Sequence, residues 1–157
     1  MNREYRYLSD AEDTTIAVAK KIARLFSAGD IIILHGDLGA GKTCFVKGFT
    51  EGCQSSDRVT SPTFSLAHFY KSNVVDILHI DLYRIDTVDE FNDLGLTDYF
   101  DQSIVLIEWG EKFANCFEAS ITISFEITGD NTRTITFTSN ADKYDALINV
   151  LNSGFLC

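Results

Sequence analysis

Residues 36–43 read Gly36-Asp37-Leu38-Gly39-Ala40-Gly41-Lys42-Thr43 and match the pattern G-x-x-x-x-G-K-[ST] at every fixed position. The octapeptide follows the apolar run Ile31–Leu34 and precedes a segment with a helical pattern, which is the strand, loop and helix context that this pattern requires. Its glycines let the backbone turn so that successive N–H groups point inward at a helix N-terminus. The stretch therefore predicts a phosphate-binding loop.

Each polar group of this loop has an expected role. Lys42 is placed to reach the β- and γ-phosphates of a nucleotide, and the Thr43 hydroxyl is placed to ligate a magnesium ion that bridges them. The alternative, a glycine-rich turn without a ligand, fits the complete match poorly. We therefore expect a nucleoside triphosphate, bound by Asp37, Leu38, Gly39, Ala40, Gly41, Lys42, Thr43 and Cys44.

Composition limits the class of protein. A chain of 157 residues is expected to form a single domain spanning residues 1–157, with its own hydrophobic core. The formal net charge is −10, from 23 acidic and 13 basic residues. Because wide non-specific binding of nucleic acid needs a basic surface, any role with RNA is expected to be indirect.

The four cysteines, Cys44, Cys53, Cys116 and Cys157, match neither a C-x-x-C metal site nor a disulfide framework. The N-terminus has no cationic, apolar signal segment, and no apolar run approaches about eighteen residues. These features predict reduced thiols, a cytoplasmic location and no contact with a membrane. For Cys44, an oxidation-sensitive thiol at a helix start and a small packed residue are both open, and the second is favoured.

Four helices are expected. The first follows a capping box at 9–12 and ends before Gly29-Asp30, and the second runs from the loop toward Gly52, a candidate C-terminal cap. A short third helix follows the capping box at 87–90 and ends at Gly95. In the last, Ser139 is expected to cap a helix whose apolar residues follow the i, i+3, i+4, i+7 pattern: Tyr144, Leu147, Ile148 and Leu151.

The remaining apolar segments predict strands. Segments 64–70 and 74–82 form an expected hairpin, as do 121–127 and 135–137. The continuous apolar run Ile104–Ile107 is typical of a central parallel strand buried on both faces. The sequence therefore predicts a single-domain, three-layer α/β fold, with a mostly parallel central sheet and antiparallel hairpin additions.

Two acids follow predicted strands. Glu108 comes directly after the buried run 104–107, and Asp81 ends the second arm of the first hairpin. Nucleotide hydrolysis needs phosphates held in line, a metal and a group that orients water, so both carboxylates are candidate magnesium ligands and catalytic residues. Which of them ligates the metal directly is open, and each has the alternative of an exposed acid at a strand end.

Neighbouring residues carry weaker signals. Arg84 is a candidate catalytic residue that stabilises charge on the phosphoryl group, or a partner of Asp86 or Asp89. The loop around Pro62 offers hydroxyls at Thr60, Ser61 and Thr63 for the γ-phosphate and metal, or is plain turn chemistry. His79 is expected to be packed or hydrogen-bonded rather than a base, and Trp109 belongs either to the core or to a surface that faces a partner.

The order of motifs is more specific than the loop alone: GDLGAGKT, then SPTF, HIDLYR, a short helix ending in LG, and IEWGEK. In this combination the chain resembles the TsaE (YjeE) family of bacterial ATPases, roughly over residues 5–150. The resemblance implies magnesium-dependent ATP hydrolysis. It also implies partnership with the TsaD and TsaB proteins in making threonylcarbamoyladenosine at tRNA position 37, with tRNA met only through the complex.

The resemblance also assigns residues. Gly36, Gly39, Gly41, Lys42 and Thr43 match the family's nucleotide loop, and Ser61–Phe64 and Asp81–Arg84 match two switch-like loops. Glu108 with Trp109 matches a Walker B-like acid and its neighbour. Cys44 departs from the family pattern, in which a second threonine is common, and a thiol is a poorer hydrogen-bond donor than a hydroxyl.

Two other functions remain open: a small nucleotide or metabolite kinase, and a nucleotide-binding module without turnover. A kinase needs a lid that supplies arginines and an acceptor pocket, and the sequence has few basic residues and no evident lid insert. A module without turnover would lack the acids Asp81 and Glu108. We therefore expect weak ATPase activity alone and a biological output that requires partners.

Overall fold

A single seven-stranded sheet organises the part of the chain that the computed structural model describes, which is residues 3–37, 39–63 and 65–157. The strand order is β1-β7-β6-β2-β5-β4-β3. The strands are β1 (Glu4–Ser9), β2 (Ile31–Gly36), β3 (Ala67–Tyr70), β4 (Asp76–Asp81), β5 (Ser103–Glu108), β6 (Ile121–Ile127) and β7 (Arg133–Ser139). The helices are α1 (Glu12–Ile22), α2 (Lys42–Gly52), α3 (Val88–Asp93) and α4 (Asp142–Asn152), with short 3₁₀ helices η1 (Ala23–Leu25), η2 (Leu96–Gln102) and η3 (Glu111–Cys116).

The centre of the sheet is parallel and its margins are antiparallel, which confirms the predicted fold class. β2 pairs in parallel with both β5 and β6, and β5 pairs in parallel with β4. The margins are the antiparallel pairs β3 with β4, β6 with β7, and β7 with β1. β1 is antiparallel to β7, and β7 is antiparallel to β6, so β1 and β6 run in the same direction. Five strands therefore end at one edge of the sheet, where the glycine-rich loop follows β2.

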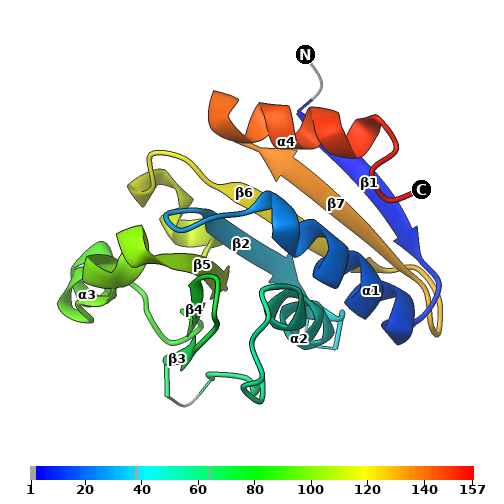
Figure 1. The fold of residues 1–157 in the computed structure, drawn as a ribbon. Coiled ribbons are helices and arrows are strands. Elements are labelled where there is room, and N and C mark those ends of the chain that lie inside the picture. Colours follow the sequence, from blue (N-terminus) through cyan, green and yellow to red (C-terminus); the bar gives the residue numbers. More distant parts are fainter. Residues whose placement is uncertain (1–2, 38, 64) are drawn as a thin grey trace.

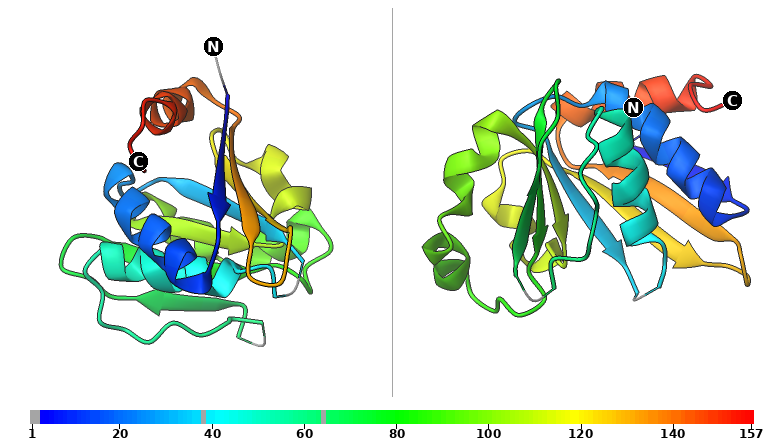
Figure 2. Two further views of the ribbon diagram at one scale, coloured as in Figure 1. Left: turned by 90° about the vertical axis from the view of Figure 1, so that its right-hand side faces the viewer. Right: turned by 60° about the horizontal axis from the view of Figure 1, so that its bottom comes forward.

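Helices cover both faces of the sheet. α1, α2 and α4 pack on one face, and α3 with η2 and η3 packs on the other face of the β2, β5 and β4 half (Figures 1 and 2). β5 divides its side chains between the two cores, since Ile104 and Leu106 lie in the first hydrophobic cluster while Val105 and Ile107 lie in the second. Every residue of β5 is buried, as its unbroken apolar run predicts.

Two predicted helix caps are wrong because a strand continues to the position assigned to the cap. Ser9 is the last residue of β1, a strand that was not predicted, and its hydroxyl bonds to Thr15 Oγ1 at 2.7 Å. Ser139 likewise ends β7. Ala11 and Ala141, with extended backbones, precede α1 and α4. The Thr87 cap is confirmed, because its hydroxyl accepts a hydrogen bond from the Glu90 N–H at 3.1 Å.

The predicted role of Gly52 as a helix cap is also wrong, because Gly52 is the last residue of α2 and serves packing instead. A Cβ built at Gly52 would collide with the carbonyl oxygen of Lys20, and one at Gly48 would collide with that of Ile16. Both carbonyls belong to α1. These glycines therefore let the backbones of α1 and α2 approach closely along the middle and the C-terminal end of α2.

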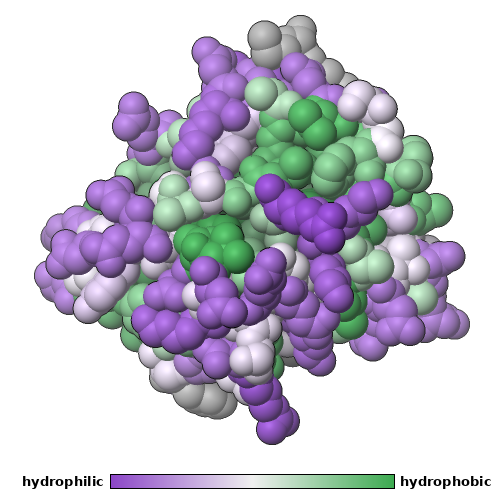
Figure 3. Space-filling view, in the orientation of Figure 1, coloured by the Kyte–Doolittle hydropathy of each residue, from purple (hydrophilic) through white to green (hydrophobic). Residues whose placement is uncertain are grey.

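The surface is largely hydrophilic on the face seen in Figure 3, with a hydrophobic patch over the C-terminal half of α4. Val150 is 40% exposed there, and Phe155 lies beneath the Lys21 ammonium at 5.3 Å from the ring centroid. Over residues 3–37, 39–63 and 65–157, none of the helices has the length and apolar character needed to span a bilayer.

Gly48→Ala tests the close approach of α1 and α2. Alanine is a better helix former than glycine by about 1 kcal/mol, so an uncrowded position would be stabilised. At position 48 the new Cβ would collide with the Ile16 carbonyl, and this cost outweighs the gain in helix propensity. We therefore expect the free energy of unfolding to fall by about 1–3 kcal/mol. Urea denaturation measures the change. Lys47→Ala, at the exposed neighbouring position of α2, serves as the control, and a stabilised Gly48→Ala protein would contradict the packing argument.

Candidate functional site

A cavity of about 250 Å³ lies at the carboxyl edge of the parallel strands, beside the glycine-rich loop. Polar and loop residues predicted for the site make up most of the lining that the structure describes. These are Gly39, Gly41, Lys42, Thr43, Cys44, Ser61, Thr63, Asp81, Glu108 and Trp109, together with Glu12. The parallel pairing explains the assembly, because residues that follow β2, β4 and β5 meet at one edge although they are far apart in sequence.

The loop backbone turns where its glycines allow it. Gly39 and Gly41 have φ angles of +81° and +109°, in the left-handed region that favours glycine. The Ala40 N–H donates to the Asp37 carbonyl at 3.0 Å, so this turn is closed internally. Asp37 and Ala40 line a neighbouring hollow with Ser124 rather than this cavity, and the predicted contact by Leu38 lies outside the described residues.

Lys42 is held at the cavity by two contacts. Its ammonium donates to the Gly36 carbonyl at 2.6 Å and lies 4.7 Å from the centroid of the Trp109 ring. Trp109 has a φ angle of +60°, a strained conformation for an aromatic residue, and its ring packs edge-on against Tyr83 at 5.0 Å between centroids. Trp109 is therefore not plain core, because it is half-buried and its ring lies over the lysine of the loop. The alternative, that Trp109 faces a partner, remains a prediction.

The two candidate acids are neighbours in the sheet. Asp81 and Glu108 are register partners at the ends of β4 and β5, and they are 3% and 5% exposed. The alternative of exposed acids at strand ends is thus wrong. Asp81 accepts hydrogen bonds from Thr63 Oγ1 at 3.2 Å and from the Tyr83 N–H at 2.9 Å.

Glu108 Oε2 lies 2.7 Å from His79 Nε2, which confirms that His79 is a packed, hydrogen-bonded residue. Both carboxylates keep contact with the cavity while part of their hydrogen-bonding capacity is satisfied from within the protein.

The hydroxyl loop, defined here as residues 60–63, contributes two residues to the wall of the cavity. Ser61 and Thr63 line the cavity, and their hydroxyls lie 2.8 Å apart. The loop is therefore more than a turn around Pro62, because two of its three hydroxyls reach the site. The family match also includes Phe64, which lies outside the described residues.

Arg84 is exposed in the chain segment after β4, and the described residues that line the cavity do not include it. Asp81, three residues earlier, does line the cavity. The role of Arg84 in stabilising charge remains a prediction.

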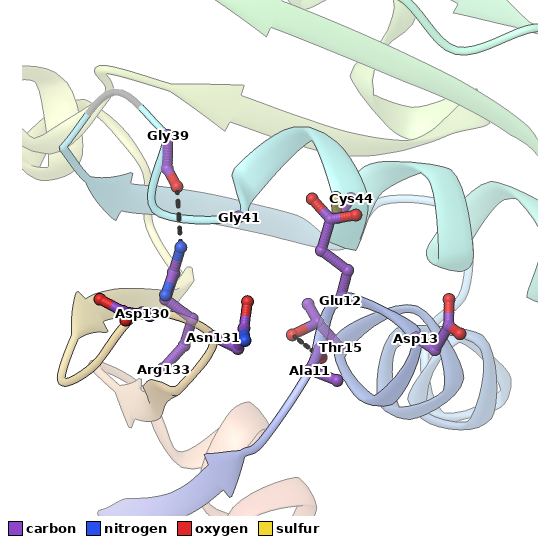
Figure 4. Close-up of a pocket in the computed structure, with 10 residues that line it drawn as sticks. All are labelled: Ala11, Glu12, Asp13, Thr15, Gly39, Gly41, Cys44, Asp130, Asn131 and Arg133. Carbon is purple, nitrogen blue, oxygen red and sulfur yellow. Dashed lines mark hydrogen bonds between the residues drawn. The ribbon is translucent and has the colours of Figure 1, made fainter.

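A second cavity, of about 400 Å³, adjoins the first through four shared lining residues, Glu12, Gly39, Gly41 and Cys44. Figure 4 shows Glu12 extending from the start of α1 toward Cys44, while Arg133 reaches the loop from the other side. The Arg133 guanidinium donates to the Gly39 carbonyl at 3.4 Å, and Asp130 and Asn131 complete that wall.

The sequence did not predict Glu12 as a residue of the site, because strand β1 was not predicted. The alternation of Tyr5 and Tyr7, which pack on the core, with Glu4 and Arg6 is the period-two signal of a strand. Since β1 ends at the same edge as β2, a residue at the start of α1 is carried to the glycine-rich loop. Tertiary placement, not proximity in sequence, makes Glu12 part of the site.

The thiol at the junction of the two cavities is less acidic than a free cysteine. Burial, followed by the nearby Glu12 carboxylate, raises the pKa of Cys44 above its usual range. Burial alone raises the pKa of Cys53 to about 11. The two open interpretations of Cys44 thus resolve toward a packed residue, because a raised pKa disfavours the reactive thiolate.

The donor set suits magnesium better than a metal held by protein alone. The described residues contain no group of three or more histidine, cysteine, aspartate or glutamate side chains arranged to hold a metal ion. Among the groups that line the cavity, the Thr43 hydroxyl beside the lysine of the loop and the carboxylates of the register partners Asp81 and Glu108 are the candidate ligands. Magnesium commonly takes one or two carboxylates and completes its octahedron with water and phosphate oxygens. The site therefore fits a magnesium ion that arrives with a phosphate ligand.

The fold and this edge define the chain as a three-layer α/β protein with a glycine-rich loop beside two buried strand-end acids. The sequence matches the family model "Threonylcarbamoyl adenosine biosynthesis protein TsaE" over residues 9–135. The chain belongs to the TsaE family, which takes part in tRNA threonylcarbamoyladenosine biosynthesis.

Relatives support this assignment along most of the chain. The TsaE protein of Bacillus subtilis (strain 168) is 39% identical over 142 residues, covering 89% of each chain. That of Treponema pallidum (strain Nichols) is 35% identical over 133 residues, covering 83% of this chain and 98% of the relative. The crystal structure of Bacillus subtilis YdiB aligns with a TM-score of 0.82 at 32% identity, covering 98% of this chain and 97% of that one.

Proposed function

We propose that the protein is a magnesium-dependent ATPase that acts with TsaD and TsaB in forming threonylcarbamoyladenosine at tRNA position 37. One observation carries the proposal: Lys42, Thr43, Asp81 and Glu108 line a single cavity beside a complete G-x-x-x-x-G-K-[ST] loop. Hydrolysis supports repeated turnover of the complex, and it is weak in the isolated protein. With a net charge of −10, the chain meets tRNA through its partners.

The two adjoining cavities suggest how ATP is accommodated. The triphosphate occupies the smaller cavity, where Lys42 binds phosphate oxygens and the N-terminus of α2 favours negative charge. The ribose and adenine occupy the larger one, between the start of α1 and the turn that carries Asn131. The carboxylate of Glu12 favours hydroxyl and amino groups there, because these donate hydrogen bonds, and disfavours a further phosphate.

In this proposal Thr43, Asp81 and Glu108 hold the magnesium ion and its waters. When bound, the ion neutralises phosphate charge and orients the phosphates for attack. Asp81 and Glu108 are fixed by neighbouring donors, so the carboxylates are oriented before the substrate arrives. The hydroxyls of Ser61 and Thr63 face the phosphates, and Arg84 stabilises charge on the transferring phosphoryl group.

Alkylation of the thiols tests the position of the nucleotide. Exposed Cys116 and Cys157 react quickly at pH 8, whereas buried Cys53, with a pKa of about 11, stays unreacted. Cys44 reacts slowly because its pKa is raised. Magnesium and ATP at about ten times the dissociation constant slow its reaction roughly tenfold, as peptide mass spectrometry can measure. Unchanged labelling of Cys44 at saturating nucleotide would contradict the proposed position.

Lys42→Ala and Glu108→Ala are each expected to abolish hydrolysis, a loss on the order of 10²–10³ or more, because each removes a charge that binds the phosphates or the metal. Phosphate release measures the rate, and circular dichroism confirms that the fold persists. Lys47→Ala, an exposed lysine on the same helix, is the control. Normal turnover by the Glu108 variant would remove that residue from the mechanism.

Reconstitution with TsaD and TsaB decides the biological role. We expect modification of tRNA over many turnovers only when the chain and ATP are both present, with Lys42→Ala protein as the matched negative control. Mass spectrometry of tRNA nucleosides gives the product yield. Equal yield with and without the chain would overturn the proposed partnership, and rapid phosphoryl transfer to a small metabolite would favour a kinase instead.

A further inference from the structure

A buried chain of hydrogen bonds runs away from the cavity, starting at Glu108. Glu108 Oε2 lies 2.7 Å from His79 Nε2, and His79 Nδ1 lies 3.0 Å from the Tyr70 hydroxyl. The Tyr70 hydroxyl lies 3.0 Å from the Thr60 carbonyl oxygen, and the Thr60 N–H approaches it at 3.4 Å. These hydrogen bonds thus join the end of β5 to the hydroxyl loop through His79 in β4 and Tyr70 in β3.

The two side chains at the centre of this chain of hydrogen bonds are shielded from water, whereas Thr60 at its end is exposed. His79 is 0% exposed and Tyr70 is 3% exposed. Burial is the main cause that raises the pKa of Tyr70, so its hydroxyl keeps its proton and remains a donor. Because a carboxylate only accepts, His79 Nε2 carries the proton shared with Glu108. Buried polar groups that satisfy one another in this way hold a single arrangement.

A second connection ties the other end of the hydroxyl loop to the neighbouring acid. Thr63 Oγ1 donates to Asp81 Oδ2 at 3.2 Å and lies 2.8 Å from the Ser61 hydroxyl. Asp81 and Glu108 are register partners. The loop is therefore fastened at Thr60 to one acid, through His79 and Tyr70, and at Thr63 directly to the other.

We propose that His79 and Tyr70 are positioning residues, which hold the Glu108 carboxylate and the hydroxyl loop as one unit. The inference rests on the proposed ATPase function. Hydrogen bonds from outside the ligand set orient carboxylates that hold a metal, and their loss typically lowers metal affinity or activity 10–100-fold. Neither residue lines the described cavity, so their effect passes through Glu108 and Thr60.

Tyr70→Phe tests the series of hydrogen bonds from Glu108 to Thr60, because it removes the Tyr70 hydroxyl oxygen and keeps the buried ring. Without nucleotide, we expect the Thr60 amide to exchange its hydrogen about two- to tenfold faster, since its bond to the Tyr70 hydroxyl is lost. With ATP, the magnesium concentration for half-saturation stays within about twofold of the wild type, because His79 Nε2 keeps its bond to Glu108. Fluorescence of Trp109, the only tryptophan in the sequence, reports that saturation independently of turnover. Tyr7→Phe, in β1 at the opposite edge of the sheet, is the matched control.

Two substitutions at His79 test its hydrogen bond to Glu108 and its hydrogen bond to Tyr70 separately. In His79→Gln the side-chain amide replaces Nε2 and still donates to Glu108, so magnesium dependence stays near that of the wild type while the Thr60 amide exchanges faster. In His79→Asn the amide replaces Nδ1, so Thr60 stays protected while magnesium half-saturation rises about tenfold. Equal effects of both variants on both readouts would show a merely structural role for His79 and overturn the proposal.

The failure of this inference is distinguishable from failure of the proposed function. A wild-type protein that shows neither a Trp109 response nor hydrolysis with magnesium and ATP contradicts the proposed function. A wild type that responds, together with unchanged Thr60 exchange in Tyr70→Phe protein and unchanged magnesium dependence in His79→Asn protein, contradicts the positioning role alone. Melting temperatures of all variants confirm that each measurement reports folded protein.

Discussion

The parallel pairing of β2, β5 and β4 is the constraint on which the site depends. It brings the glycine-rich loop, Glu108 and Asp81 to one edge, where no two of them are neighbours in sequence. A shift of β5 by one residue would exchange its two core faces and move Glu108 away from Asp81. The burial of both faces of β5 opposes such a shift, so the packing that stabilises the sheet also sets the geometry of the acids.

The site combines strain and buried charge, which the surrounding cores support. Trp109 has a strained backbone and its ring lies over Lys42, while two glycines in the middle and at the end of α2 allow α1 to approach closely. Acidic residues outnumber the basic ones that line both cavities. Under the proposed function, this excess of negative charge is a physical reason for an anionic nucleotide to bind together with a cation such as magnesium.

Local patterns predicted most elements because they are local physical effects. The run at 104–107 predicted a strand buried on both faces, and Thr87 predicted a helix cap, since an unbroken apolar segment and a side-chain hydroxyl act over a few residues. The predictions at Ser9, Ser139 and Gly52 were wrong because each local pattern fits a helix terminus while a tertiary contact fixes the residue. Ser9 and Ser139 are paired in strands, and Gly52 packs against α1.

The sequence by itself determined the fold class, the glycine-rich loop after a strand and the acids at the strand ends, because glycine spacing and apolar runs report local backbone and burial. Only the tertiary structure decided that Glu12 reaches the loop through an unpredicted β1, and that a buried histidine and tyrosine join Glu108 to Thr60. These contacts join segments whose spacing carries no pattern. These contacts arise from the order of the strands in the sheet, which the sequence of the glycine-rich loop does not specify.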